Sequence, residues 1–125
     1  MRPTPGSTRR RRALPAAAQP NPADWDAVLQ EAKGQTVYWH AWGGDPRIND
    51  FIAWVGEQAL ARHGVTVTQV KLASTADAVA RVQSEQAAGV VTGGAVDLVW
   101  INGENLAALK AADLLSGPFA EALPN

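Results

Sequence analysis

The sequence predicts an α/β fold in which helices alternate with the strands of a parallel sheet. Helical and strand patterns follow one another from about residue 21 onward, and alternating elements of this length require parallel strands joined by right-handed crossovers. Residues 36–49 and 96–105 each start as an apolar, β-rich run, break at glycine and polar residues, and pass into a helical pattern. Polar loops that follow parallel strands open on one edge of the sheet, where α/β proteins bind ligands.

Composition sets the class of protein before any motif is considered. The chain has 125 residues, which suits about one domain, and its hydrophobic fraction of 46% is that of an ordinary globular protein. Five of its eleven basic residues lie in the first eighteen positions, so the remainder carries six basic and twelve acidic residues, a net charge of −6. This negative net charge after the first eighteen residues argues against nucleic-acid binding, which requires a basic surface. The absence of cysteine excludes disulfides and zinc–thiolate sites.

Residues 1–20 are rich in arginine, proline and alanine, and we leave them outside the expected fold. The arginines at 9–12 resemble the basic start of an export signal, and the alanines at 16–18 resemble a signal-peptidase site. The apolar segment of roughly 7–15 residues that should separate them is missing. Two interpretations therefore stay open, a disordered tail or the remnant of an export signal.

Residues 21–125 are expected to form a partial α/β lobe, which opens with a helix and a strand. Asn21 and Pro22 predict the helix start, and Gly34 its end. An apolar stripe at helical spacing is expected to place Trp25 in the core. The strand is predicted over 36–42 because the residues are β-branched and aromatic.

Two further helices and a strand follow. Asp45 and Pro46 repeat the start signal, and Gly64 ends this helix. Its apolar face is expected to contain Ile48, Phe51, Ile52, Val55 and Ala59. The next strand is predicted over 65–72. Ser74 and Asp77 then resemble a capping box for a helix that runs to about residue 88.

The last strand is predicted over 96–101, where only Asp97 interrupts an apolar run. Such a run is expected for a central strand covered on both faces. Asn102 is expected to cap a short final helix. Three strands make a thin sheet with exposed edges, and we expect the chain to be the front part of a longer protein.

The candidate ligand-binding residues lie in the three loops between strand and helix. They are Trp42, Gly43, Gly44, Asp45, Ser74, Thr75, Asn102, Gly103 and Glu104. Adjacent glycines allow close approach of a ligand, and helix N-termini offer N–H groups. The loop over 42–45 matches neither a phosphate-binding P-loop nor a dinucleotide fingerprint. A sharp turn with helix caps remains an equal alternative there, and Asp97 is expected to be a hydrogen-bonded structural carboxylate.

The search for catalytic residues yields little. His40 and His63 show no metal-ligand spacing, and no nucleophile elbow is present, so we expect no enzyme activity, no cofactor and no metal. Asp45 and Glu104 are the only candidates for an acid/base pair. The alternative function is therefore a small α/β enzyme that acts on a phosphorylated small molecule with these two carboxylates.

Several segments resemble the solute-binding proteins of ABC transporters, in particular a thiamine-transport branch. The similarity extends from about residue 24 to the end of the sequence. It is found in residues 38–45, 48–49 with 54–55, 70–72, 96–105, 117–119 and 123–125, and most specifically in the Trp-Ile-Asn-Gly-Glu-Asn string of residues 100–105. It implies a periplasmic receptor with two α/β lobes around a cleft, of which this chain matches part of the first. Members of the family are about three times as long, so the second lobe has no counterpart here.

The resemblance also implies partners and a site. The partners would be a small solute and a membrane permease, and the first-lobe contacts fall on the loops named above. Three helix N-termini favour an anionic group, whereas Asp45 and Glu104 favour a cation, for which Trp42 offers an aromatic face. A cationic or thiamine-like solute is the expectation. We expect a monomer, although an interaction domain that pairs through its sheet edges is a third possibility.

Overall fold

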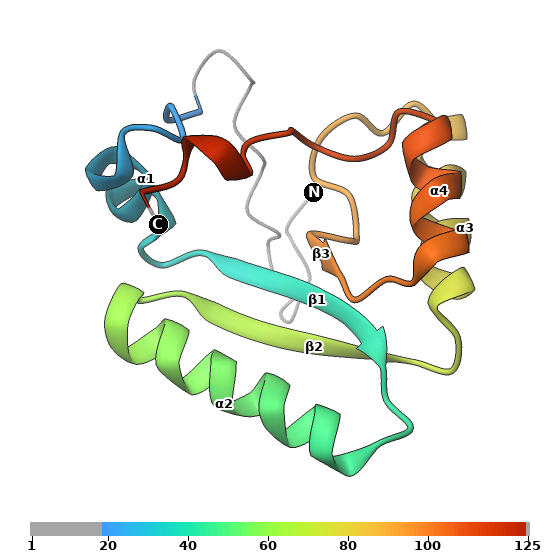
Figure 1. Ribbon diagram of the computed structural model, residues 1–125, viewed down its shortest axis with the longest axis horizontal. Coiled ribbons are helices and arrows are strands. Elements are labelled where there is room, and N and C mark those ends of the chain that lie inside the picture. The colour runs from blue at the N-terminus through green and yellow to red at the C-terminus, as the bar shows by residue number, and fades with distance from the viewer. Residues whose placement is uncertain (1–18, 125) are drawn as a thin grey trace, which may run out of the picture.

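The computed structural model describes residues 19–124, so the predicted tail of residues 1–20 lies almost wholly outside the described residues. Within them the chain is an α/β structure in which helices alternate with the strands of one parallel sheet, as predicted (Figure 1). The elements are α1 (Trp25–Ala32), β1 (Thr36–Trp42), α2 (Pro46–His63), β2 (Thr66–Leu72), α3 (Thr75–Ala87), β3 (Leu98–Val99), α4 (Gly103–Ala111) and a short 3-10 helix, Ala120–Ala122.

The sheet has the strand order β2-β1-β3, and both pairings are parallel. β1 pairs with β2 along its whole length, from Thr36 opposite Thr66 to Trp42 opposite Leu72. With β3 it shares only two register positions, one of which places His40 opposite Val99. β1 is therefore the central strand, and the carboxyl ends of all three strands point to one edge.

The prediction of a long, central third strand over 96–101 was wrong. β3 has two residues and lies at the edge of the sheet, with Leu98 45% and the neighbouring Trp100 43% exposed. The cause lies at Asp97, whose carboxylate Oδ2 accepts the N–H of Tyr38 at 2.9 Å. A side-chain oxygen thereby takes the hydrogen bond that a backbone carbonyl would accept in a longer strand.

The first helix begins three residues later than predicted and does not enter the core. Asp24 caps it by accepting the N–H of Ala27 at 3.1 Å, while Asn21 accepts the N–H of Ala23 in the preceding turn. None of its side chains is buried, and Trp25 is 39% exposed. The expected core position of Trp25 was wrong because α1 lies beside the sheet end without close packing against any one strand.

The second helix has the predicted bounds. Asp45 caps it through the N–H of Arg47 at 2.8 Å, and Gly64 ends it with a left-handed backbone at φ 67°. It packs on β2. Ile52 is 2% exposed, and one turn later a Cβ on Gly56 would lie 3.5 Å from Cβ of Val67. Gly56 thus lets the helix lie close to the strand.

The other face of the sheet is covered by α3, against which α4 packs (Figure 1). Side chains alternate along a strand, so His40, whose register partner is Val70, points away from the face on which Val67 meets α2. His40 is buried, and its Nε2 lies 3.0 Å from the carbonyl oxygen of Ala95. The main buried helix residues on this side are Ala78, Val79 and Leu109.

The loop between α3 and β3 is held by one carboxylate. Glu85 accepts the N–H of Ala95 with both oxygens, at 3.0 Å each, and Arg81 donates to the same carboxylate at 2.8 Å. Since Ala95 also contacts His40 on β1, the carboxylate links α3, the loop and the central strand. The sequence patterns did not indicate this role of Glu85.

Candidate functional site

The predicted loops follow the carboxyl ends of three adjacent parallel strands. Residues 42–45 follow β1 in the middle of the sheet, 74–75 follow β2 on one side, and 102–104 follow β3 on the other. From β1 the chain crosses to β2 through α2 and then returns past β1 to reach β3. β1 is therefore the point at which the strand order reverses, and in open α/β sheets the crevice at such a point is the usual place of ligand binding.

The loop after β1 is held by hydrogen bonds on both sides. The N–H of Gly43 donates to the carbonyl of Leu72 at 3.0 Å, which extends the ladder by one residue beyond β1. The side chain of Asn49 donates to the carbonyl of Gly43 at 3.0 Å and accepts from Gln69 at 2.9 Å. The loop is thus tied to β2 and to α2, which gives a fixed scaffold for its side chains.

Trp42 lies at the end of β1, as predicted, and is 47% exposed. One side of its indole covers Gly44, because a Cβ added to that glycine would overlap the ring. A Cβ on Gly43 would similarly lie 2.7 Å from Cβ of Lys71. Both glycines are therefore required by close packing within the protein, whatever ligand the loop takes.

We expect Gly44→Ala to displace the Trp42 ring. The added methyl group occupies the volume of the indole, so the side chain must adopt another rotamer or the loop must shift, at a cost of roughly 1–3 kcal/mol in the free energy of unfolding. Urea denaturation measures the cost. In a chain where Trp42 is the only tryptophan retained, a changed emission maximum reports the displacement, and an unchanged one contradicts it. Gly103→Ala is the matched control, because a Cβ at that position would meet nothing within 4 Å. Gly34→Ala is unsuitable as a control, because the backbone φ of 78° at Gly34 is strained for alanine.

Two of the predicted residues act as helix caps. Asp45 accepts the N–H of Arg47 with one oxygen, and its other oxygen lies 3.4 Å from the guanidinium of the same residue. Ser74 Oγ accepts the N–H of Ala76 at 3.3 Å, so Ser74 caps α3, but the reciprocal bond to the Asp77 carboxylate that the predicted capping box requires is not formed. Thr75 is the first residue of α3. The loops at 42–45 and 74–75 therefore also fit the alternative interpretation, in which each is a turn followed by a helix cap.

The third loop differs from the other two. Asn102 stands at the cap position of α4 but makes no capping hydrogen bond, because its side-chain oxygen accepts from the side chain of Asn105 at 2.6 Å. The prediction that Asn102 caps the helix was wrong in this respect. Gly103 and Glu104 form the exposed first turn of α4. Among the three helices that start at this edge, α4 alone presents its N-terminus without a side-chain cap.

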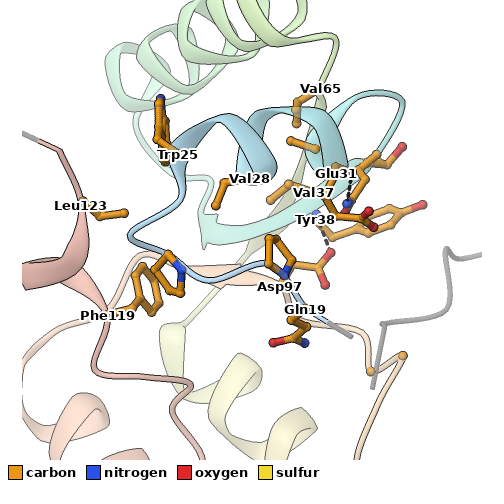
Figure 2. Close-up of a pocket in the computed structure, with 17 residues that line it drawn as sticks. Gln19, Trp25, Val28, Glu31, Val37, Tyr38, Val65, Asp97, Phe119 and Leu123 are labelled. Atoms are coloured by element: carbon orange, nitrogen blue, oxygen red, sulfur yellow. Dashed lines mark hydrogen bonds between the residues drawn. The ribbon is translucent and has the colours of Figure 1, made fainter. Parts of the chain in front are cut away.

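A separate pocket of about 610 Å³ lies toward the other end of β1, against residues 36–38 (Figure 2). None of the nine predicted site residues lines it. Its apolar wall includes Trp25, Val28, Val37, Val65, Phe119 and Leu123, and its carboxylates are Glu31 and Asp97. Sequence reasoning missed this pocket because its walls come from segments far apart in the chain, and no local pattern marks them as neighbours.

The prediction for Asp97 is confirmed, since its carboxylate bonds to the backbone of β1. In residues 19–124 no three histidine, aspartate or glutamate side chains are grouped closely enough to hold a metal ion. None of the helices there combines the length and apolar character needed to cross a membrane.

Comparison with known proteins gives one informative relative. Protein YnjB of Escherichia coli (strain K12) is 50% identical to this chain over 103 residues, which are 82% of the chain and 26% of the relative. The chain thus spans about a quarter of the length of the curated relative it matches. No family model matches the sequence, and no solved structure matches it either.

Proposed function

We propose that this chain belongs to the solute-binding component of an ABC importer and contributes a ligand-binding edge to it. The solute would bind against the loops at 42–45 and 102–104 and be delivered to a membrane permease. On this proposal the protein works outside the cytoplasmic membrane, in the periplasm, and the chain supplies part of the first of two lobes. Two of the segments that resemble such proteins, residues 38–45 and the more specific residues 100–105, include the loops at this edge.

The observation that carries the proposal is the reversal of strand order at β1. β2 and β3 lie on opposite sides of β1, and in open α/β sheets the loops that follow two strands at such a reversal are the usual place of ligand binding. The loop after β1 is fixed by bonds to Leu72 and Asn49, so its side chains are oriented before a ligand arrives. Preorganisation of this kind lowers the entropic cost of binding.

The chemistry of the edge favours a solute with an aromatic or cationic ring. Trp42 offers a partly exposed indole, and Glu104 adds an exposed carboxylate beside the start of α4. The uncapped N-terminus of α4 favours an anionic group on the same solute. A molecule that carries both a cationic ring and an anionic substituent, as thiamine phosphates do, would use all three features.

The proposal is tested by titrating thiamine and thiamine monophosphate into the full 125-residue chain by isothermal calorimetry. We expect weak, saturable binding with a Kd on the order of 0.1–1 mM, because one sheet edge encloses only part of a ligand that a closed pocket would surround. Trp42→Ala and Glu104→Gln should each weaken binding about tenfold.

Two variants serve as controls. Trp54→Ala removes an exposed tryptophan that lies outside the edge and should leave Kd unchanged. Trp25→Ala alters the pocket beside β1 and should likewise have no effect on these ligands. Absence of saturable binding contradicts the proposal for this chain, and loss of binding in Trp25→Ala alone would move the site to the pocket.

The same protein and ligand samples also test the alternative that the chain is an enzyme. An enzyme that uses Asp45 and Glu104 would release phosphate from thiamine monophosphate, and Asp45→Asn would abolish the release. The contacts of Asp45 do not favour this alternative, because both of its oxygens are directed to Arg47. Binding without turnover supports the transport function.

A further inference from the structure

Asn102 is followed by Gly103, and asparagine before glycine is the sequence in which the side-chain amide is least stable. The amide is lost when the backbone nitrogen of the next residue attacks the side-chain carbon Cγ, and glycine has no Cβ to obstruct this attack. Both residues are exposed at the start of α4. A Cβ added to Gly103 would meet nothing within 4 Å, so no neighbouring group shields the pair from water.

The other asparagines in the described part of the chain lack this combination. Asn21 precedes a proline, which has no N–H and therefore offers no nucleophile. Asn49 lies within α2, and its side chain is fixed by two hydrogen bonds at 3.0 and 2.9 Å. Asn105 precedes Leu106, whose N–H is bonded to a backbone carbonyl at 2.9 Å. Among these residues, Asn102 alone combines an unobstructed nucleophile with an exposed amide.

The contacts of Asn102 also favour the attack. The N–H of Gly103 has no hydrogen-bond acceptor among the described residues, as is usual for the first N–H of a helix. Oδ1 of Asn102 accepts a side-chain N–H of Asn105 at 2.6 Å. This oxygen becomes negatively charged when Cγ is attacked, and a donor already directed at it stabilises that charge. A free nucleophile and a polarised carbonyl therefore lie on adjacent residues.

One backbone hydrogen bond opposes the reaction. The N–H of Leu106 donates to the carbonyl of Asn102 at 2.9 Å, and the backbone of Asn102 must rotate away from this bond before Cγ can be reached. Asn102 itself has an extended backbone, with φ −103° and ψ 173°, so the rotation opens only the first turn of α4. The terminal turns of helices open at a small cost in free energy.

We propose that Asn102 is a modification site, at which the amide is lost spontaneously and aspartate or isoaspartate is formed. Hydroxide removes the proton of the Gly103 N–H, and the nitrogen bonds to Cγ of Asn102. The Cγ–Nδ2 bond breaks, and the leaving nitrogen takes a proton from water and departs as ammonia, which restores the hydroxide. Water then adds to one of the two carbonyl carbons of the resulting succinimide. Opening of the ring at Cγ gives aspartate, and opening at the main-chain carbonyl gives isoaspartate.

The modification places a carboxylate at the start of α4. Asn102 stands at the cap position but makes no capping hydrogen bond, whereas an aspartate there accepts N–H groups of the first turn and complements the helix dipole. Isoaspartate adds a methylene group to the backbone and displaces the helix start. The modification does not depend on any solute. Its effect on binding, repulsion of an anionic group from α4, rests on the proposed function.

Mass spectrometry of the full 125-residue chain, sampled over weeks at mildly alkaline pH, tests the proposal. The tryptic peptide of residues 82–110 contains both Asn102 and Asn105, and fragmentation assigns the mass gain to one of them. Electron-transfer fragmentation distinguishes the two products, and Asn102→Asp supplies the aspartate standard. We expect the gain at Asn102, at least as fast in the folded chain as in the same chain unfolded in urea.

Variants separate the contribution of the fold from that of the sequence. Asn105→Ala should slow the loss about fivefold in the folded chain, by removal of one hydrogen bond, and should have no effect in urea. Gly103→Ala should slow it at least about tenfold in both states. Leu106→Ala is the matched control, because it truncates a side chain of the same turn that is 41% exposed and leaves Asn105 in place.

Two results overturn the proposal. An amide at Asn102 that persists in the folded chain but is lost in urea would show that α4 protects the pair. An unchanged or faster rate in folded Asn105→Ala would show that this residue only holds the helix together, because a loosened α4 exposes Cγ more often. Neither measurement includes a solute, so failure here is distinct from failure of the proposed function.

Discussion

Ile52→Ala is expected to lower the free energy of unfolding by about 3 kcal/mol. Ile52 is 2% exposed and is the largest side chain that is fully buried in the described part of the chain. It lies one turn before Gly56, on the face of α2 that approaches β2. Removal of three carbon atoms leaves a cavity between helix and sheet that close backbone packing prevents from collapsing.

Urea denaturation followed by far-ultraviolet circular dichroism measures this loss. Leu60→Ala provides the matched control on the same helix, because Leu60 is 56% exposed and its truncation should cost less than about 1 kcal/mol. Similar losses for the two variants would contradict the packing described for α2. The comparison is informative because both substitutions remove an aliphatic side chain from a helix and differ mainly in burial.

The second large effect is expected for Glu85→Ala, at about 2 kcal/mol. The carboxylate accepts the N–H of Ala95 with both oxygens, and hydrogen bonds to a charged group are stronger than those between neutral groups. Its side chain is only 19% exposed, so water restores little of the lost interaction. Without it the loop that leads to β3 loses its attachment to α3, and we expect faster amide hydrogen exchange at Ala95.

Two related variants distinguish the loop contact from the ion pair. Arg81→Ala removes the cation but keeps the bonds to Ala95, and because Arg81 is 60% exposed its loss should cost less than about 0.5 kcal/mol. Glu85→Gln retains one acceptor oxygen and should fall between the other two. Equal destabilisation by Arg81→Ala and Glu85→Ala would show that the ion pair, not the loop contact, stabilises this region.

The loop contact also affects the candidate site. The segment after Ala95 continues through β3 to Asn102, where the uncapped start of α4 faces the carboxyl edge. Glu85 therefore helps to position one of the two loops between which the solute is proposed to bind. We expect Glu85→Gln to remain folded, with the intermediate loss of stability given above, and to bind the proposed solute more weakly in calorimetric titration.

Elements whose signals are local were predicted well. α2 has its cap at Asp45, its proline at the first position and its left-handed glycine at Gly64, all within or next to the helix itself. β1 matches its predicted range of 36–42, since β-branched and aromatic residues form an unbroken run there. The three loops of the candidate site follow from these boundaries, because parallel strands place their carboxyl ends at one edge.

Elements that depend on distant partners were not predicted. The apolar run at 96–101 indicated a covered central strand, but Asp97 binds the backbone of Tyr38 and shortens the ladder to two residues. The stripe that includes Trp25 indicated a packed helix, yet α1 buries none of its side chains. In both cases hydrophobic periodicity shows which face of the element is apolar, but it does not show whether another element is present to cover that face.

The order of elements, their parallel arrangement and the position of the polar loops follow from the sequence, because caps, glycines and strand-forming residues act over a few neighbouring positions. Which strand is central, which helix N-terminus remains uncapped, and where a pocket forms were decided by the tertiary structure. These properties depend on contacts such as those of Glu85 with Ala95 and of Trp39 with Trp100, which join residues from separate elements. A local sequence pattern carries no information about such contacts, because they form only when separate elements pack together.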